Sequence, residues 1–265
     1  MASTKAPAAD ERKRALAAMF ERHILRDARS PVFREYCRQV HGVDRFQYNA
    51  VSAAHFEQVL QALSLSRGDT FLDVGCAAGT MTVEVARRTG ARGVGIDIAP
   101  GVVELASNLA AAGPAVSFQV GDLDDPRLPP SSFDAIMALD TLYFARDLPK
   151  TVRDLLALLK PGGRLVALFS AFQGPDQSPS VLTAGGTALA TALGEAGVLF
   201  EVTDLTQDDR EHWKRAIDAT AALKPAWEAR GELDAWRARC EENDEIAPLV
   251  AAGRSARFLY LARTS

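Results

Sequence analysis

The sequence predicts an α/β fold with a parallel sheet, on three observations. From Asp69 onward, short apolar runs alternate with segments of helical periodicity, which is the pattern of βαβ units. Gly90 and Gly113 stand where a left-handed residue would end two of the helical segments. The chain has 265 residues, 48% of them hydrophobic, which is enough to bury a large core.

Seven short apolar runs are the predicted strands. They cover residues 70–74, 93–98, 116–120, 133–139, 164–169, 199–203 and 258–262. The helices between them are predicted over 80–89 and 99–112, with a further helix that begins at Asp147 and ends at the Pro-Gly-Gly turn of 161–163.

Two regions outside this alternation are expected to be helical. Residues 1 to about 65 carry apolar stripes at helical spacing, with a polar and aromatic break at 42–49. Residues 207–252 hold all three tryptophans and return to helical spacing, and Thr206 with Asp209 has the form of a capping box. The second region lies between the last two predicted strands, so we expect it to be an insertion.

Composition narrows the class of partner and the compartment. The net charge is −4 and no Lys/Arg tract occurs, so nucleic acid and anionic membranes are disfavoured as partners. The chain has an odd number of cysteines, Cys37, Cys76 and Cys240, and their spacing does not match that of metal ligands. We therefore expect three free thiols in a reducing compartment, and no metal site. The N-terminal residues do not have the pattern of a signal peptide, in which a basic stretch precedes an apolar one, and no apolar run is long enough to span a membrane. We therefore expect a cytoplasmic protein with a small-molecule partner.

Three consecutive strand ends carry residues suited to a nucleoside. The first predicted strand runs into a small-residue turn at 75–79 that opens a helix, where a ligand can approach the backbone. Asp97 ends the second strand, where a carboxylate can accept hydrogen bonds from ribose hydroxyls. Asp122 follows the third strand and can accept a hydrogen bond from an exocyclic amine such as that of adenine. Together they predict an adenosine site without a phosphate cradle.

With these residues the chain resembles the class I S-adenosylmethionine-dependent methyltransferases. The segment LDVGCAAG at 72–79 is similar to the first motif of that family, and GID at 95–97 and GD at 121–122 to its ribose and adenine acids. SFDAI at 132–136 resembles the fourth strand, and LKPGGRL at 159–165 the turn before the fifth. One residue departs from the family pattern, because Ala77 stands where the turn usually has a glycine.

The resemblance implies a Rossmann-like, doubly wound, mostly parallel seven-stranded sheet whose last strand is antiparallel, plus a helical cap. It implies a core of 66–206 and 254–265, an N-terminal cap of 1–65, and an insert of 207–253 that contributes to the cap. The implied cofactor is S-adenosylmethionine, with S-adenosylhomocysteine as product. The implied cofactor-binding residues are Asp73, Gly75, Cys76, Ala77, Gly79, Asp97, Ile98, Gly121, Asp122, Leu123, Leu139 and Tyr48.

The sequence offers fewer candidate catalytic residues than cofactor-binding residues. Asp140 and Tyr143 follow the fourth strand, where the methyl group would point in the family, and the Asn/Asp-Pro-Pro-aromatic motif typical of base and amide methylation is missing. His41, Tyr143 and His212 are the candidates for catalysis, since a histidine can serve as general base near neutral pH. The alternative for each histidine is a surface or packed side chain.

These features favour transfer of a methyl group from S-adenosylmethionine to a small-molecule metabolite by in-line displacement. Two other functions stay open. One is a cofactor-binding protein that regulates or acts without methylating. The other is a nicotinamide-dependent oxidoreductase, although the four-residue spacing of Gly75 and Gly79 differs from the G-x-G-x-x-G spacing of such enzymes. The sequence leaves the acceptor, the methylated atom and the oligomeric state undetermined.

Overall fold

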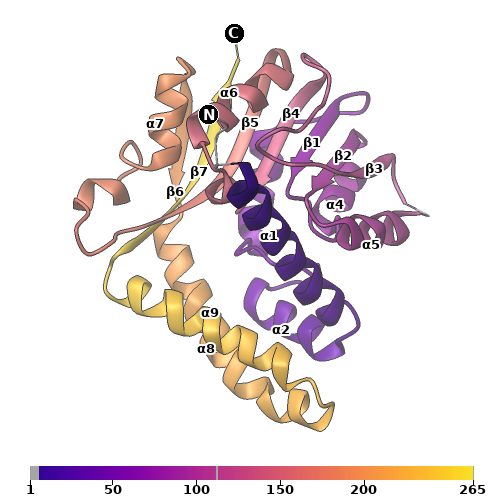
Figure 1. The fold of residues 1–265 in the computed structure, drawn as a ribbon, viewed down its shortest axis with the longest axis vertical. Helices are drawn as coiled ribbons and strands as arrows, with labels where there is room; N and C mark the ends of the chain where they lie inside the picture. Colours follow the sequence, from indigo (N-terminus) through magenta and orange to yellow (C-terminus); the bar gives the residue numbers. More distant parts are fainter. Residues whose placement is uncertain (1–5, 112, 265) are drawn as a thin grey trace.

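A seven-stranded sheet forms the centre of the computed structural model, which describes residues 6–111 and 113–264. The strands are β1 (Thr70–Val74), β2 (Arg92–Asp97), β3 (Val116–Val120), β4 (Phe133–Leu139), β5 (Leu159–Phe172), β6 (Phe200–Asp204) and β7 (Ser255–Arg263). Their order is β3-β2-β1-β4-β5-β7-β6, and β7 runs antiparallel to both of its neighbours. The predicted fold class, with its antiparallel last strand, is therefore confirmed (Figure 1).

Helices cover both faces of the sheet, so its central strands are buried on both sides. Ile136 of β4 packs with α6 (Leu148–Leu158) and α7 (Ala188–Glu195) in one apolar cluster. The adjacent Ala135 and Met137 belong to a second cluster with α3 (Ala53–Leu63) and α4 (Thr80–Thr89). α5 (Pro100–Ala110) packs on β2 and β3. This burial explains why the strands appear in the sequence as continuous apolar runs.

Four further helices gather beyond the sheet in Figure 1. They are α1 (Ala6–Asp27), α2 (Pro31–His41), α8 (Thr206–Ala229) and α9 (Leu233–Ala251). Their shared apolar cluster is centred on large side chains such as Phe33 and the fully buried Trp227. In the figure α1 runs between the sheet and the lower helices, and the Glu21 carboxylate accepts a hydrogen bond from Gly101 N at the start of α5.

The helix ends follow the predicted signals in part. Gly90 ends α4 in the left-handed conformation, and the Asp147 side chain accepts the hydrogen bond from Lys150 N that opens α6. The predicted closure by Gly113 is wrong: α5 stops at Ala110, and Ala111 continues with right-handed backbone. Ala112, the predicted last residue, lies outside the described residues.

The predicted capping box of Thr206 and Asp209 is also wrong. The N-cap of α8 is Leu205, which makes no side-chain cap, and the Thr206 hydroxyl accepts a hydrogen bond from Arg257 N instead. Packing of α8 against β7 thus takes the hydroxyl that the local pattern assigned to the helix. The Asp209 side chain therefore does not cap α8.

Other differences are small. α6 already ends at Leu158, and the Pro-Gly-Gly turn lies in an irregular stretch of β5, where the register with β4 shifts. α7 was not anticipated from the sequence. No helix in the described ranges is long and apolar enough to cross a membrane. Cys37, Cys76 and Cys240 are all free.

Candidate functional site

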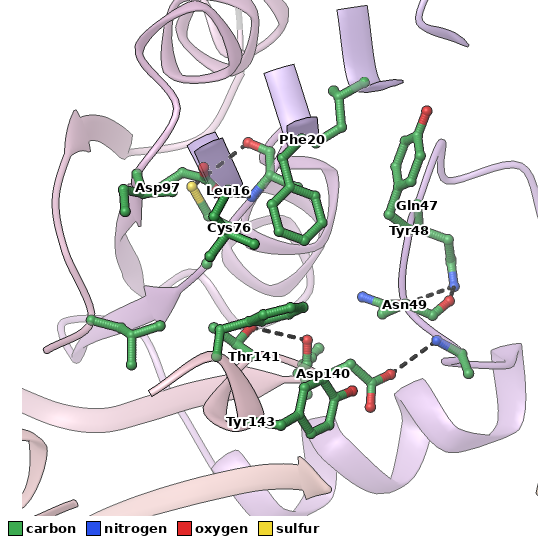
Figure 2. A pocket seen from close by; sticks show the side chains of 18 of the residues that line it. Leu16, Phe20, Gln47, Tyr48, Asn49, Cys76, Asp97, Asp140, Thr141 and Tyr143 are labelled. Carbon is green, nitrogen blue, oxygen red and sulfur yellow. Dashed lines mark hydrogen bonds between the residues drawn. The ribbon is translucent and has the colours of Figure 1, made fainter. Parts of the chain in front are cut away.

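A cavity of about 540 Å³ opens at the carboxyl ends of β1, β2 and β4. A volume of this size is typical of small-molecule and cofactor sites. Its walls come from the strand-end loops, from α1, from the segment after α2 and from α9. Figure 2 shows Asp97 and Cys76 on one side of the cavity, Asp140 and Tyr143 on another, and Phe20 of α1 above Asp140 and Tyr143 in this view. The helices α1 and α9, which lie outside the alternation of strands and helices, therefore cover the carboxyl edge of the sheet.

The turn after β1 has a left-handed backbone at three positions, Gly75, Ala77 and Gly79. A Cβ at Gly75 would lie 2.5 Å from Thr141, and one at Gly79 would lie 2.4 Å from Phe118, so close packing requires both glycines. Gly75 and Ala77 line the cavity, whereas Gly79 does not. Gly79 thus packs the helix against the sheet, and its predicted contact with the cofactor stays a prediction.

Asp97 lies at the end of β2 and is held in place by backbone donors. Its Oδ2 accepts a hydrogen bond from Ala77 N, and its Oδ1 accepts one from Ala99 N, each at 3.0 Å. Burial raises the pKa of this carboxyl above its usual value, although these N–H groups act in the opposite direction. The carboxylate also lines the cavity, so its remaining acceptor positions can meet a ligand hydroxyl.

Two more acids lie around the same end of the cavity. Asp73 is buried beneath the turn, where the Thr82 hydroxyl donates to it at 2.6 Å, and burial raises its pKa to about 7. Asp122 pairs with Lys13 of α1. The remaining predicted contacts Cys76, Ile98, Gly121, Leu123 and Leu139 line the cavity as well. The acids and the glycine turn therefore meet at one site.

The segment between α2 and α3 forms another wall. Gln47 Nε2 donates to Val51 O at 2.6 Å and to Asn49 Oδ1 at 2.9 Å, which folds the segment on itself. Tyr48 lines the cavity, but its hydroxyl donates to Asp27 Oδ2 at 2.6 Å. Tyr48 therefore presents its ring, and its polar end is used to anchor α1.

A buried charge cluster occupies the other end of the cavity. Asp140 has a left-handed backbone, and its Oδ2 accepts hydrogen bonds from Arg257 Nη2 at 2.6 Å and from Ala50 N at 2.9 Å. A dashed line in Figure 2 marks a hydrogen bond to the Asp140 carboxylate. Arg257 also donates to Ser170 Oγ at 2.8 Å. Burial alone would raise the pKa of Asp140, yet the guanidinium outweighs it and holds the pKa below its usual value.

The three candidate catalytic residues are separated by the structure. Tyr143 lines the cavity with 38% of its surface exposed, and burial by surrounding protein together with the charge of Asp140 raises its pKa. His41 and His212 are each 5% exposed and do not line the cavity. Their rings pack together with centroids 5.3 Å apart, and burial lowers both pKa values. Neither histidine therefore reaches a ligand in this cavity.

Two site residues were missed from the sequence. Asp209, 3% exposed, and Arg257, 2% exposed, both line the cavity from the α8 and β7 elements. The only signal for Arg257 was a charged residue within an otherwise apolar strand. Asp209 gave no signal, because it occurs among charged residues at the start of a helix.

Comparisons with known proteins agree with the geometry. A family model described as a methyltransferase domain matches residues 71–163. The methyltransferase GfsG of Streptomyces halstedii is 28% identical over 186 residues, which are 64% of this chain and 67% of that protein. The chain spans half or less of the length of other curated relatives that it matches.

Solved structures share the fold at lower identity. Phosphoethanolamine N-methyltransferase 2 of Haemonchus contortus aligns with a TM-score of 0.71 and 15% identity, over 92% of this chain and 60% of that chain. The [4+2]-cyclase SpnF aligns with a TM-score of 0.63 and 22% identity, over 79% of each chain. At these identities the likeness establishes the architecture and leaves the chemistry to the site.

Proposed function

The chain belongs to the class I S-adenosylmethionine-dependent methyltransferases, and from this premise we propose that it transfers a methyl group from that cofactor to a small-molecule acceptor. The observation that carries the proposal is the continuity of one cavity. Strand-end acids line one end of it, and side chains from both helical regions line the other. A cofactor and an acceptor can therefore lie in contact within a shared enclosure.

The residues present fit S-adenosylmethionine by their chemistry. The cofactor carries a sulfonium, an ammonium and a ribose diol, and it has no phosphate. The cofactor end of the cavity offers the carboxylates of Asp73, Asp97 and Asp122 as acceptors. Asp122 is paired with Lys13, so Asp97 beside the glycine turn is the acid that would meet a pyrophosphate unfavourably, which argues against the nicotinamide alternative.

Each of these residues would contact a different group of the cofactor. Asp97 would accept hydrogen bonds from the ribose hydroxyls, since its position is fixed by Ala77 N and Ala99 N. Asp122 would face the adenine amine, and Gly75 allows close approach along the turn. Ala77 is accommodated with a left-handed backbone, so the departure from the family's glycine leaves the turn intact.

We assign residues 6–65 and 207–253 to a cap that encloses the acceptor; residues 1–5 of the predicted N-terminal cap lie outside the described residues. Phe20 of the first region and Trp213 of the second both line the cavity. The bound cofactor supplies an activated methyl group on sulfur, so the protein's task is to hold a nucleophile in line with it. Positioning can contribute roughly 7–11 kcal/mol, so no strong base is needed. Tyr143 is retained as an acceptor contact, and His41 and His212 are not.

Calorimetry with S-adenosylhomocysteine tests the first half of this proposal. We expect saturable binding with one site per chain and no comparable binding of NADH. Incubation with methyl-labelled S-adenosylmethionine and fractionated metabolite extracts tests the second half, with label recovered in a small product. Failure to bind S-adenosylhomocysteine contradicts the proposal outright. Binding without label transfer to any fraction favours the non-methylating alternative.

A further inference from the structure

The end of the cavity away from Asp97, here called the acceptor end, holds a charge imbalance. Its lining includes Asp140, Tyr143, Asp209, Trp213 and Arg257. The Oδ2 atom of Asp140 accepts hydrogen bonds from Arg257 Nη2 and from Ala50 N, whereas its Oδ1 atom is buried without a hydrogen-bond partner. Two carboxylates thus face one guanidinium inside the protein.

Asp209 is the carboxylate that is not hydrogen-bonded to the Arg257 guanidinium. Its Oδ1 lies 3.9 Å from Arg257 Nε, and both atoms are buried without a hydrogen-bond partner. The residue is only 3% exposed, yet it lines the cavity. A buried carboxylate oxygen without a donor is unfavourable because it has lost its hydrogen bonds to water, so a ligand that supplies a donor is favoured here.

Nearby basic groups do not remove the imbalance. Burial lowers the pKa values of His41, His55 and His212, so these side chains are neutral near pH 7. Arg215 donates to Val40 O. Burial raises the pKa of Asp209 to about 6, so this carboxyl is still ionised at neutral pH. The acceptor end therefore carries net negative charge when no ligand compensates it.

Aromatic walls complete the environment. Phe20, Tyr143, Phe172 and Trp213 line the cavity, and the faces of such rings attract cations. An anionic ligand would be repelled by Asp209, and a neutral hydroxyl would supply a donor but no charge. A protonated amine supplies both.

We propose that the acceptor is a small molecule with a protonated amine, and that Asp209 binds this ammonium group. This inference rests on the proposed methyl transfer and specifies the substrate class of the same site. Asp209 is a substrate-binding residue in this scheme. Asp140 and Arg257 are positioning residues, because their ion pair fixes the charge beside which the ammonium binds.

A matched set of aromatic probes tests the inference by calorimetry on the protein loaded with S-adenosylhomocysteine. Tryptamine, tryptophol and indole-3-acetate share the indole ring and differ in the charge of the side chain. We expect tryptamine to bind about 10-fold or more tightly than tryptophol, because a hydrogen bond between two charged groups is stronger than one from a neutral hydroxyl. We expect indole-3-acetate to bind least, because its carboxylate is repelled by Asp209.

Variants separate recognition from structure. Asp209→Asn should bring the two affinities to within about threefold, whereas Asp209→Glu, which keeps the charge, should retain part of the preference. Asp218→Asn, at an exposed position on the same helix, is the matched control and should bind as wild type does. Thermal melts check that each variant is folded, and a purely structural role would lower stability without changing the order of the probes.

Three results would overturn the inference: equal affinity for tryptamine and tryptophol, a preference that survives in Asp209→Asn, or no tryptamine binding at millimolar concentration. Normal binding of S-adenosylhomocysteine with any of these leaves the proposed methyl transfer intact. If S-adenosylhomocysteine itself fails to bind, the proposed function fails. The same probe titrations on the free protein then still test Asp209.

Discussion

The Asp140 carboxylate and the Arg257 guanidinium form an ion pair at 2.6 Å with side chains only 8% and 2% exposed. The pair joins the loop after β4 to the last strand, 117 residues later. Because Ser170 of β5 and Ala50, which precedes α3, also bond to it, the pair ties four segments together beside the cavity.

Removing Arg257 should destabilise the protein strongly. Arg257→Met leaves Asp140 and Asp209 buried without their cation, and loss of one partner of a buried pair typically costs about 3–5 kcal/mol. Urea unfolding at neutral pH measures this. Arg263→Met, on the same strand as Arg257, breaks an exposed ion pair with Glu201 of β6 and should cost less than about 1 kcal/mol. Equal losses in the two variants would contradict a structural role for the buried pair.

The sheet could be predicted because its information is local. The runs at 70–74, 116–120 and 133–139 match β1, β3 and β4 at both ends. β1 and β4 are almost wholly buried, which favours apolar runs, whereas the edge strand β3 is largely exposed and alternates apolar with polar residues. β5 and β7 extend beyond their predictions, because their nine-residue antiparallel pairing continues past the apolar runs. α5 ends early because a glycine nearby in sequence does not by itself adopt a left-handed cap.

The site divides in the same way. Asp97 and Asp122 could be expected at the cavity because parallel strands bring their carboxyl ends to one edge. Asp209 and Arg257 meet because the chain returns through α9 and places β7 against α8. His41 and His212 were chosen for their intrinsic pKa, but the packing of α2 on α8 buries them together. Long-range packing, which no local pattern encodes, decided each of these cases.

Asp97→Ala should weaken the binding of S-adenosylhomocysteine. Loss of hydrogen bonds from the ribose hydroxyls to a charged group predicts about 10- to 100-fold lower affinity by calorimetry. Asp125→Ala, at an exposed acid beyond β3, should bind the cofactor product normally. An unchanged affinity in Asp97→Ala would place the ribose elsewhere.

Asp73→Asn should make folding less sensitive to alkaline pH. Burial raises the folded-state pKa of Asp73 to about 7 from an ordinary value near 4, so the folded protein holds this proton more tightly than the unfolded chain. Wild-type stability from this group is therefore greatest at low pH and falls as the pH rises to about 7. Asparagine can still accept from Thr82 and has no charge to bury.

Urea unfolding of the cofactor-free protein at about pH 5 and pH 8 measures this difference. The gain in unfolding free energy from Asp73→Asn should be about 2–3 kcal/mol greater at the higher pH. Asp154→Asn, in a surface pair with Lys150, serves as control and should show no such trend. A gain that is the same at both pH values would mean that Asp73 is ionised in the folded protein.

The buried histidine pair should make the protein sensitive to acid. Burial, with Arg215 and Arg239 nearby, lowers the folded-state pKa of His41 to about 3, whereas the unfolded value is near 6.5. The unfolded chain therefore takes up this proton first as the pH falls below about 6.5, and stability is lost down to about pH 3. By about pH 5 the loss from His41 should be roughly 2 kcal/mol.

His41→Gln removes the titrating group and should reduce the loss of unfolding free energy between about pH 7 and pH 5 by that amount. His23→Gln, at a half-buried position, should change the pH dependence less. The double variant of His41 and His212 should change it further, because two imidazolium rings at a 5.3 Å separation would repel each other. If wild type and His41→Gln lose stability in parallel, the acid sensitivity originates elsewhere, and the pair is protonated without cost.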